Sequence, residues 1–333
     1  MSKKIFKDPK LQERFETEGY VKIPFLHRAD VRQLQEMFFQ YFPEPAEGFF
    51  SSSYLNDFDL KKEISNKIVE VMNPRFERYF TNYRCFGSAF LSKTAGNRSE
   101  MPMHQDWSIV NEDEFVAVNI WTPLSDADKT NGSLEVLPGS HSFAKVRRSP
   151  TLPFFWEGYE GEMQKGLYPL QVLAGEAVVL NQATVHYSPA NKTPEVRPAI
   201  TTGLLSAGAK MEFNYQTAPG EVDIYQMEDD FLLQWENFHE AIFKRPTFGE
   251  VVRQEQYAHP KVPREEFLSY LTGLQEGAKN AQIAAIANYM DMHGMVPGAS
   301  TTATRPPIPQ ANQTPPPRPE KVGFFERLKR MFG

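Results

Sequence analysis

Two different periods of apolar residues predict the elements at the start of the chain. Residues 8–18 are mostly polar, carry Pro9 near their start and stop before Gly19, which is typical of a short surface helix. The stretch from Gly19 to Pro24 alternates between apolar and polar residues, as a half-buried strand does. We expect it to open the sheet of the fold.

Two longer helices are predicted next, the first capped by Asp30 and the second over residues 57–72. Their apolar positions follow the 3.6-residue period: Val31, Leu34, Met37 and Phe38 in the first helix, and Leu60, Ile64, Ile68 and Val71 in the second. We expect both helices to pack on the outside of a sheet, and we assign them no chemistry.

Short apolar runs fill residues 83–205, with turn residues at 94–97, 129–132 and 138–139. No internal repeat is evident. Many short strands without intervening helices indicate a sandwich or a barrel.

Changes of pattern divide the chain into four parts: a β core with N-terminal helices (1–215), a helical extension packing on the core (216–292), a Pro-rich flexible linker (293–320) and a short basic tail (321–333). The helical pattern of the extension covers residues 228–292. It carries one apolar stripe, typical of a core or a dimer interface: Phe231, Leu232, Trp235, Phe238 and Ile242. The acidic stretch before it, residues 219–228, is interpreted as a solvated face.

The basic tail places its apolar residues on one face of a helix and Lys and Arg opposite. Such a segment suits docking to a partner groove or to an anionic membrane surface. An isolated helix of this length is marginal in water, so a tail without function remains an equal alternative.

Composition narrows the class of protein. The chain of 333 residues is 41% hydrophobic and 23% charged, which is ordinary for a globular protein. Its net charge of −6 gives no electrostatic support to a nucleic-acid partner. The single cysteine, Cys85, excludes an internal disulfide and fits a reducing compartment. No secretory signal and no apolar run long enough to span a membrane are visible, so we expect a cytoplasmic protein.

A metal-ligand pattern stands in the sequence His104-Gln105-Asp106, with His186 following 82 residues after His104. Side chains at positions i and i+2 of a strand point the same way, so His104 and Asp106 share a face. Two histidines and one carboxylate are the ligand set that holds non-haem Fe(II) and leaves positions open for oxygen and a co-substrate. The bland alternative is three satisfied polar residues of the core.

An arginine follows the second histidine at a defined spacing. Arg197 comes eleven residues after His186 and is followed by Pro-Ala-Ile. Its planar guanidinium binds a carboxylate through two hydrogen bonds, which an anionic oxo-acid co-substrate requires.

Four stretches around these residues complete a recognisable order: Val116 to Leu124, Asn131-Gly-Ser-Leu-Glu-Val-Leu-Pro-Gly-Ser-His141, Val172 to Leu180, and His186 to Ala199. Over residues 10–210 this order resembles the phytanoyl-CoA dioxygenase family of Fe(II)/2-oxoglutarate oxygenases. The resemblance implies a mainly β fold with flanking helices, the double-stranded β-helix (jelly roll, cupin-like).

The resemblance also implies roles for individual residues. His104, Asp106 and His186 are the expected catalytic metal ligands, and Arg197 is the expected clamp for 2-oxoglutarate. We expect further contacts to the co-substrate from Ser188, Gln105 and Trp121. Lys93 at the end of its strand is another candidate, although a surface lysine is the preferred interpretation. His141 is expected to be structural or near the co-substrate, and no role is assigned to His27, His239, His259 or His293.

The reaction that the resemblance implies is oxidation of an unactivated C–H bond by O₂, with 2-oxoglutarate converted to succinate and CO₂. Because related halogenases lack the carboxylate ligand, Asp106 favours hydroxylation, or desaturation or ring chemistry by the same oxidant, over halogenation. The substrate is expected to be a small-molecule or carrier- or CoA-tethered metabolite. Lys145, Arg147 and Arg148 are the nearest candidates for CoA phosphates, but a solvated basic turn is the preferred interpretation.

Two other functions stay open. A metal-dependent cupin enzyme that does not use 2-oxoglutarate would keep the three ligands and give Arg197 a structural ion pair. A catalytically silent scaffold would act through its C-terminal tail. The insertion at residues 143–169, rich in Pro, Gly and aromatic residues, either covers the site or is a surface loop whose aromatics cover the core edge.

Overall fold

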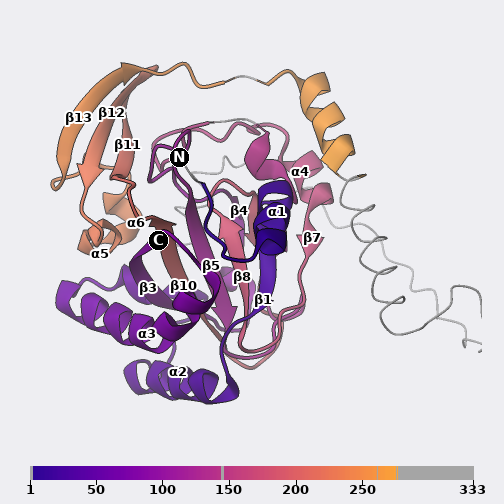
Figure 1. Ribbon diagram of the computed structural model, residues 1–333, viewed down its shortest axis with the longest axis vertical. Coiled ribbons are helices and arrows are strands. Elements are labelled where there is room, and N and C mark those ends of the chain that lie inside the picture. Colours follow the sequence, from indigo (N-terminus) through magenta and orange to yellow (C-terminus); the bar gives the residue numbers. More distant parts are fainter. Residues whose placement is uncertain (1–2, 144–145, 261, 275, 277–333) are drawn as a thin grey trace, which may run out of the picture. The chain divides into compact units, whose positions relative to one another are not determined.

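The computed structural model in Figure 1 describes residues 3–143, 146–260, 262–274 and 276. Its strands form three antiparallel sheets. The largest has the spatial order β1 (Tyr20–Pro24), β8 (Glu176–Asn181), β5 (Ala117–Pro123), β10 (Arg197–Ser206), β3 (Tyr83–Lys93) and β2 (Phe49–Ser51). The second has the order β4 (Met101–His104), β9 (His186–Ser188), β6 (Glu135–Val136) and β7 (Tyr168–Pro169). The third consists of β11 (Met211–Ala218), β12 (Glu221–Met227) and β13 (Glu250–Gln256).

The first two sheets share a core, as the alternation along β8 shows. Ala177 and Val179 pack with the N-terminal helices, whereas Val178 and Leu180 pack with Val136 of the second sheet. A strand that is buried on both faces requires a layer on each side, here helices on one side and a sheet on the other. This arrangement confirms the predicted class, a mainly β jelly roll with flanking helices.

The N-terminal elements follow local signals. Helix α1 (Pro9–Glu18) begins where the Asp8 carboxylate accepts the Lys10 backbone N–H at 2.8 Å. It ends at Gly19, whose φ of 80° lies in the left-handed region that favours glycine. The predicted surface helix and the strand that follows it are confirmed.

Helices α2 (Arg28–Tyr41) and α3 (Phe58–Tyr79) pack against the outer face of the largest sheet (Figure 1). Two details of their prediction were wrong. The cap of α2 is His27, and Asp30 lies inside the helix, where its carboxylate accepts the His27 N–H at 2.9 Å. Helix α3 continues past residue 72 and through Pro74, because burial of Phe76 offsets the backbone hydrogen bond that proline removes.

The helical prediction for residues 228–292 was wrong in part. Within it lie two short helices, α5 (Phe231–Gln234) and α6 (Phe238–Ala241), then strand β13, and residues 264–274 are helical. The apolar stripe is core: Phe231, Trp235 and Ile242 are buried against β11 and β12. Strand β11 crosses the boundary predicted between residues 215 and 216. The predicted linker and tail lie outside the described residues.

The insertion after β6 contains the short helix α4 (Glu160–Gly166) and an aromatic cluster. Phe155 and Trp156 are buried there together with Phe267 and Leu271 from the helical residues 264–274. The aromatics therefore cover a core edge, one of the two alternatives predicted. Single-turn helices η1 (Ser52–Tyr54), η2 (Asn97–Ser99) and η3 (Ser140–Ser142) complete the elements. No described helix has the length and apolar character that crossing a bilayer requires.

Candidate metal centre

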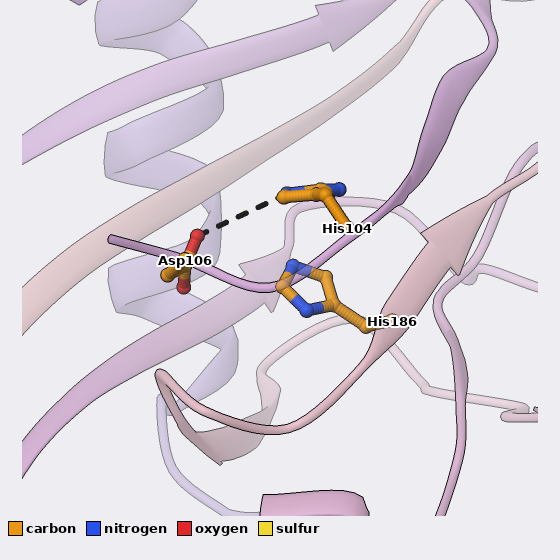
Figure 2. A group of neighbouring side chains, drawn as sticks. All are labelled: His104, Asp106 and His186. Atoms are coloured by element: carbon orange, nitrogen blue, oxygen red, sulfur yellow. Dashed lines mark ion pairs between the residues drawn. The ribbon is translucent and has the colours of Figure 1, made fainter. Parts of the chain in front are cut away.

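His104, Asp106 and His186 come together at the end of the second sheet, as Figure 2 shows. His104 is the last residue of β4 and lies opposite His186, the first residue of β9, in the antiparallel register. One possible ligand atom from each of the three side chains lies within 4.8 Å of the others. The pairing of β4 with β9 therefore brings His104 and His186 together, although 82 residues separate them in sequence.

Both histidine rings are oriented by the backbone. The Nδ1 of His104 lies 2.7 Å from the carbonyl oxygen of Pro102, and the Nδ1 of His186 lies 3.0 Å from that of Thr184. Because a carbonyl oxygen only accepts, each Nδ1 carries the hydrogen and donates it. The lone pair of each neutral ring is then on Nε2, the atom that binds a metal.

Charge at the site also suits metal binding. Burial, and after it the nearby His186, lower the pKa of His104 to about 4. The ring is thus neutral near pH 7 and can donate a lone pair. Two imidazole nitrogens and one carboxyl oxygen fit Fe(II), which accepts nitrogen and oxygen ligands together.

Asp106 is held from two sides by Asn119 and Arg148, to which the sequence analysis assigned no role at the metal. Asn119 on β5 donates from Nδ2 to the Asp106 Oδ2 at 3.3 Å and accepts the Thr201 hydroxyl. Arg148 donates from Nε to the Asp106 backbone oxygen at 2.8 Å. The sequence contains one indication of a role for Asn119, because it is a polar residue inside the apolar run 116–124.

The prediction of a solvated basic turn was wrong for Arg148. Its side chain is 4% exposed, is paired with Glu112 and also donates to the Val146 carbonyl at 3.0 Å. The side chain of Arg147 is paired with Glu255. Both guanidinium groups are therefore already engaged by the protein, and Lys145 lies outside the described residues.

A pair of buried cations lies along the same inner sheet face. Arg197 on β10 and Lys93 on β3 are register partners, and they are 2% and 0% exposed. Lys93 donates to the carbonyl oxygens of Ser188 at 2.8 Å and Pro189 at 2.7 Å. The surface location predicted for Lys93 was wrong.

Arg197 lies over the Trp121 ring, with 5.3 Å between the guanidinium carbon and the ring centroid. Its Nη1 is buried without a hydrogen-bond partner, and its Nε makes one long contact of 3.4 Å to the Asn131 carbonyl. Among the described residues, no carboxylate forms an ion pair with Arg197 or Lys93. Burial lowers the pKa of Arg197 to about 9, and burial together with Arg197 lowers the pKa of Lys93 well below its usual range.

The remaining predicted contacts are already hydrogen-bonded to the protein. Ser188 donates its hydroxyl to the Gly132 carbonyl at 2.8 Å. Gln105 donates from Nε2 to the Ala183 carbonyl, while its Oε1 is buried without a partner among the described residues. His141 in η3 contacts the Glu16 carbonyl at 3.0 Å and is not one of the three clustered ligands.

Comparison with known proteins places this site in a family. The model of the family described as Phytanoyl-CoA dioxygenase (PhyH) matches residues 27–199, just over half of the chain. The rice protein "Phytanoyl-CoA dioxygenase 1" (Oryza sativa subsp. japonica) is 28% identical over 206 residues, which cover 52% of this chain and 70% of the rice protein. "Phytanoyl-CoA dioxygenase domain-containing protein 1 homolog" from Dictyostelium discoideum is 26% identical over 46% of this chain and 64% of its own length.

Solved structures include the "non-heme alpha ketoglutarate dependent carbocyclase SnoK from nogalamycin biosynthesis", at 19% identity and a TM-score of 0.47, covering 61% of this chain and 86% of SnoK. EvdO2 from Micromonospora carbonacea var. aurantiaca, complexed with 2-oxoglutarate, has 18% identity and a TM-score of 0.41 over 60% of this chain and 91% of its own. The family match and the curated relatives confirm the predicted class of enzyme and its cofactors, Fe(II) and 2-oxoglutarate. The chain belongs to the phytanoyl-CoA dioxygenase family, the non-haem iron dioxygenases that its metal-ligand pattern predicted.

Proposed function

We propose that this enzyme hydroxylates an unactivated C–H bond of a small-molecule or tethered metabolite, with release of succinate and CO₂. The observation that carries the proposal is the cluster of His104, Asp106 and His186, with both rings oriented so that Nε2 is free to bind. Iron held there supplies the activation of O₂ and the oxidation of the C–H bond. The protein contributes position, charge and exclusion of water.

Arg197 and Lys93 are the proposed anchor for the far carboxylate of 2-oxoglutarate. Two buried cations without a carboxylate partner among the described residues form a site whose desolvation cost an anionic ligand offsets. The fork of Arg197 and the ammonium of Lys93 together match the two oxygens of one carboxylate. The Trp121 ring lies against the Arg197 guanidinium and helps to position it.

Ser188 and Gln105 are proposed as secondary contacts. The Ser188 proton is engaged with Gly132, and a carboxylate has no proton to donate, so contact with the co-substrate requires the hydroxyl to rotate away from that carbonyl. Gln105 holds the Ala183 backbone, three residues before His186, and so positions the second histidine.

Hydroxylation is favoured over halogenation because Asp106 is present and is held by Asn119. The proposed substrate is a small molecule in preference to a fatty acyl-CoA, since Arg147 and Arg148 are paired with glutamates. A cytoplasmic location remains a prediction. Docking through residues 321–333 also remains a prediction, because that tail lies outside the described residues.

The test is anaerobic addition of Fe(II) and then 2-oxoglutarate to the full chain, with the visible charge-transfer band of the chelate as readout. The wild type is expected to give the band, His186→Ala to lose it and Arg197→Ala to need more 2-oxoglutarate. Metal binding without a band would instead support a cupin enzyme that does not use 2-oxoglutarate. A wild type that binds no metal would support the silent scaffold.

A further inference from the structure

The inner face of strands β5 and β10 orders the parts of the site. Arg197 and Trp121 lie toward one end of this face, and Asn119, which holds Asp106, lies in the middle. Ala117 and Leu205, paired in the register, lie toward the other end and pack into the hydrophobic cluster of the third sheet. The metal-ligand group thus lies between a cationic end and an apolar end. The cationic end suits the co-substrate. The apolar end is therefore the part of this face that remains for the substrate.

Three half-buried aromatic rings gather at this apolar end. Trp107 directly follows Asp106, and its ring lies nearly parallel to Phe238, with planes 7° apart and centroids 6.1 Å apart. Phe238 in turn stacks on Tyr54 at 4.9 Å. We call these residues, Tyr54, Trp107 and Phe238, the aromatic group.

The aromatic group is assembled from three separate segments, and hydrogen bonds join the segment of Tyr54 to that of Phe238. Next to Tyr54 and Phe238, the Asn237 backbone N–H donates to the Asn56 side chain at 2.8 Å. The buried Lys61 of α3 donates to the Trp235 carbonyl at 2.8 Å. Rings packed on one another in this way form one half-buried aromatic wall that is already ordered before a ligand binds.

Charge around the aromatic group opposes a phosphate-rich ligand. Residues 211–243 contain eight Asp and Glu residues and no Lys or Arg. Lys and Arg from neighbouring segments are engaged with these carboxylates, in the ion pairs Arg84–Asp229, Lys62–Asp230 and Arg245–Asp223. Coenzyme A carries several phosphate charges and would find no unengaged cluster of cations here among the described residues. Together with Arg253–Glu212 and Lys244–Glu240, these ion pairs neutralise five of the eight carboxylates, which weakens the attraction of the segment for a cationic ligand.

We propose that the aromatic group is the substrate-binding surface and that the substrate is an uncharged molecule with a planar ring system, not a CoA thioester. A planar ring suits packing against a wall of aromatic rings and loses little conformational entropy on binding. The proposal rests on the proposed function, because it takes the three metal-ligand candidates as the reacting centre.

The experiment measures binding of three probes to the full chain loaded anaerobically with Fe(II) and 2-oxoglutarate, by equilibrium dialysis. The probes are 2-naphthol, its saturated and non-planar analogue decahydro-2-naphthol, and octanoyl-CoA. We expect 2-naphthol to bind about tenfold more tightly than decahydro-2-naphthol, and octanoyl-CoA to bind least. Tighter binding of octanoyl-CoA, or equal binding of the two ring compounds, would overturn the proposal.

Variants then locate the surface. Phe238→Leu and Trp107→Leu are expected to weaken 2-naphthol binding at least about fivefold. Phe39→Leu, at an aromatic residue of α2 that is 46% exposed, is the matched control and should change nothing. Circular dichroism verifies folding, and Phe238→Leu decides if Trp107→Leu does not fold. Unchanged affinity in a folded Phe238→Leu would contradict the proposal.

The charge-transfer band in the same samples separates the two hypotheses. A band together with the wrong order of probe affinities overturns the substrate class alone. Absence of the band in the wild type overturns the proposed function, whatever the probes do.

Discussion

The metal-ligand group and the cationic end of the site are both buried and polar, yet they differ in how complete their interactions are. His104, Asp106 and His186 each have a hydrogen bond from the protein that fixes their orientation. Arg197, in contrast, has a buried nitrogen without a partner, and neither it nor Lys93 has a carboxylate partner among the described residues. The three metal-ligand candidates are held in place before a metal binds, whereas the cationic end would gain stability from the carboxylate that we propose it binds.

The largest expected effect concerns the metal-ligand group, His104, Asp106 and His186. Asp106→Ala removes the oxygen ligand and leaves the Asn119 amide without its acceptor. We expect metal affinity to fall by more than about 100-fold, because even residues that only orient a ligand are worth 10- to 100-fold. Titration with Fe(II) under anaerobic conditions measures this. The control is Asp59→Ala, an exposed carboxylate in the first turn of α3; equal metal affinities in the two variants would exclude Asp106 as a ligand.

The next effect concerns the cationic end. Arg197→Lys keeps the charge but loses the planar fork, and we expect the Kd for 2-oxoglutarate to rise about 30-fold, equivalent to about 2 kcal/mol. Metal affinity should stay within about twofold of the wild type, since the substitution changes none of the three metal-ligand candidates. An unchanged Kd for 2-oxoglutarate would show that the anion is held elsewhere and would remove the contrast between the two parts.

Arg148 and Arg147 offer a matched pair for testing whether residues beyond the metal-ligand group help to position it. Both are paired with a glutamate, but only Arg148 donates to the Asp106 backbone. We expect Arg148→Gln to weaken metal binding about tenfold and Arg147→Gln to leave it unchanged. Thermal unfolding of both variants shows the structural cost of each lost ion pair. If the two variants lost metal affinity equally, Arg148 would have no specific role in positioning Asp106.

The smallest effect is a pH dependence at the cationic end. The pKa of Lys93 is lowered in the folded protein, whereas the unfolded chain keeps that proton up to about pH 10.5. Between the lowered pKa of the folded state and about pH 10.5, the unfolded state therefore binds more protons than the folded state. The stability of the ligand-free protein should rise with pH over this range. Melting temperatures from pH 7 to 10 should show a shallower rise in Lys93→Met than in the wild type. Saturating 2-oxoglutarate should flatten the wild-type curve, and identical slopes in both proteins would contradict the lowered pKa of Lys93.

Local signals in the sequence were sufficient for the N-terminal elements and for the identity of the metal-ligand candidates. Asp8, Pro9 and Gly19 act within a few residues of their own backbone, so the limits of α1 could be predicted. The spacing of His104 and Asp106 works in the same way, because alternate residues of one strand share a face. The selection of His186 and Arg197 relied on the family's motif order as well, since nothing local connects them to His104.

The tertiary structure decided the burial of the long basic side chains and the pairing of distant strands. Lys93 and Arg148 look like surface residues in sequence, and they are buried because strands and loops from elsewhere in the chain close over them. Residues 250–256 form a strand because they pair with β12. No local period of apolar residues predicts this strand. The sequence, read together with the family's motif order, predicted which groups bind metal and co-substrate. Only the fold decided which polar groups hold them and which are left without a partner, since desolvation and hydrogen bonding depend on neighbours from distant parts of the chain.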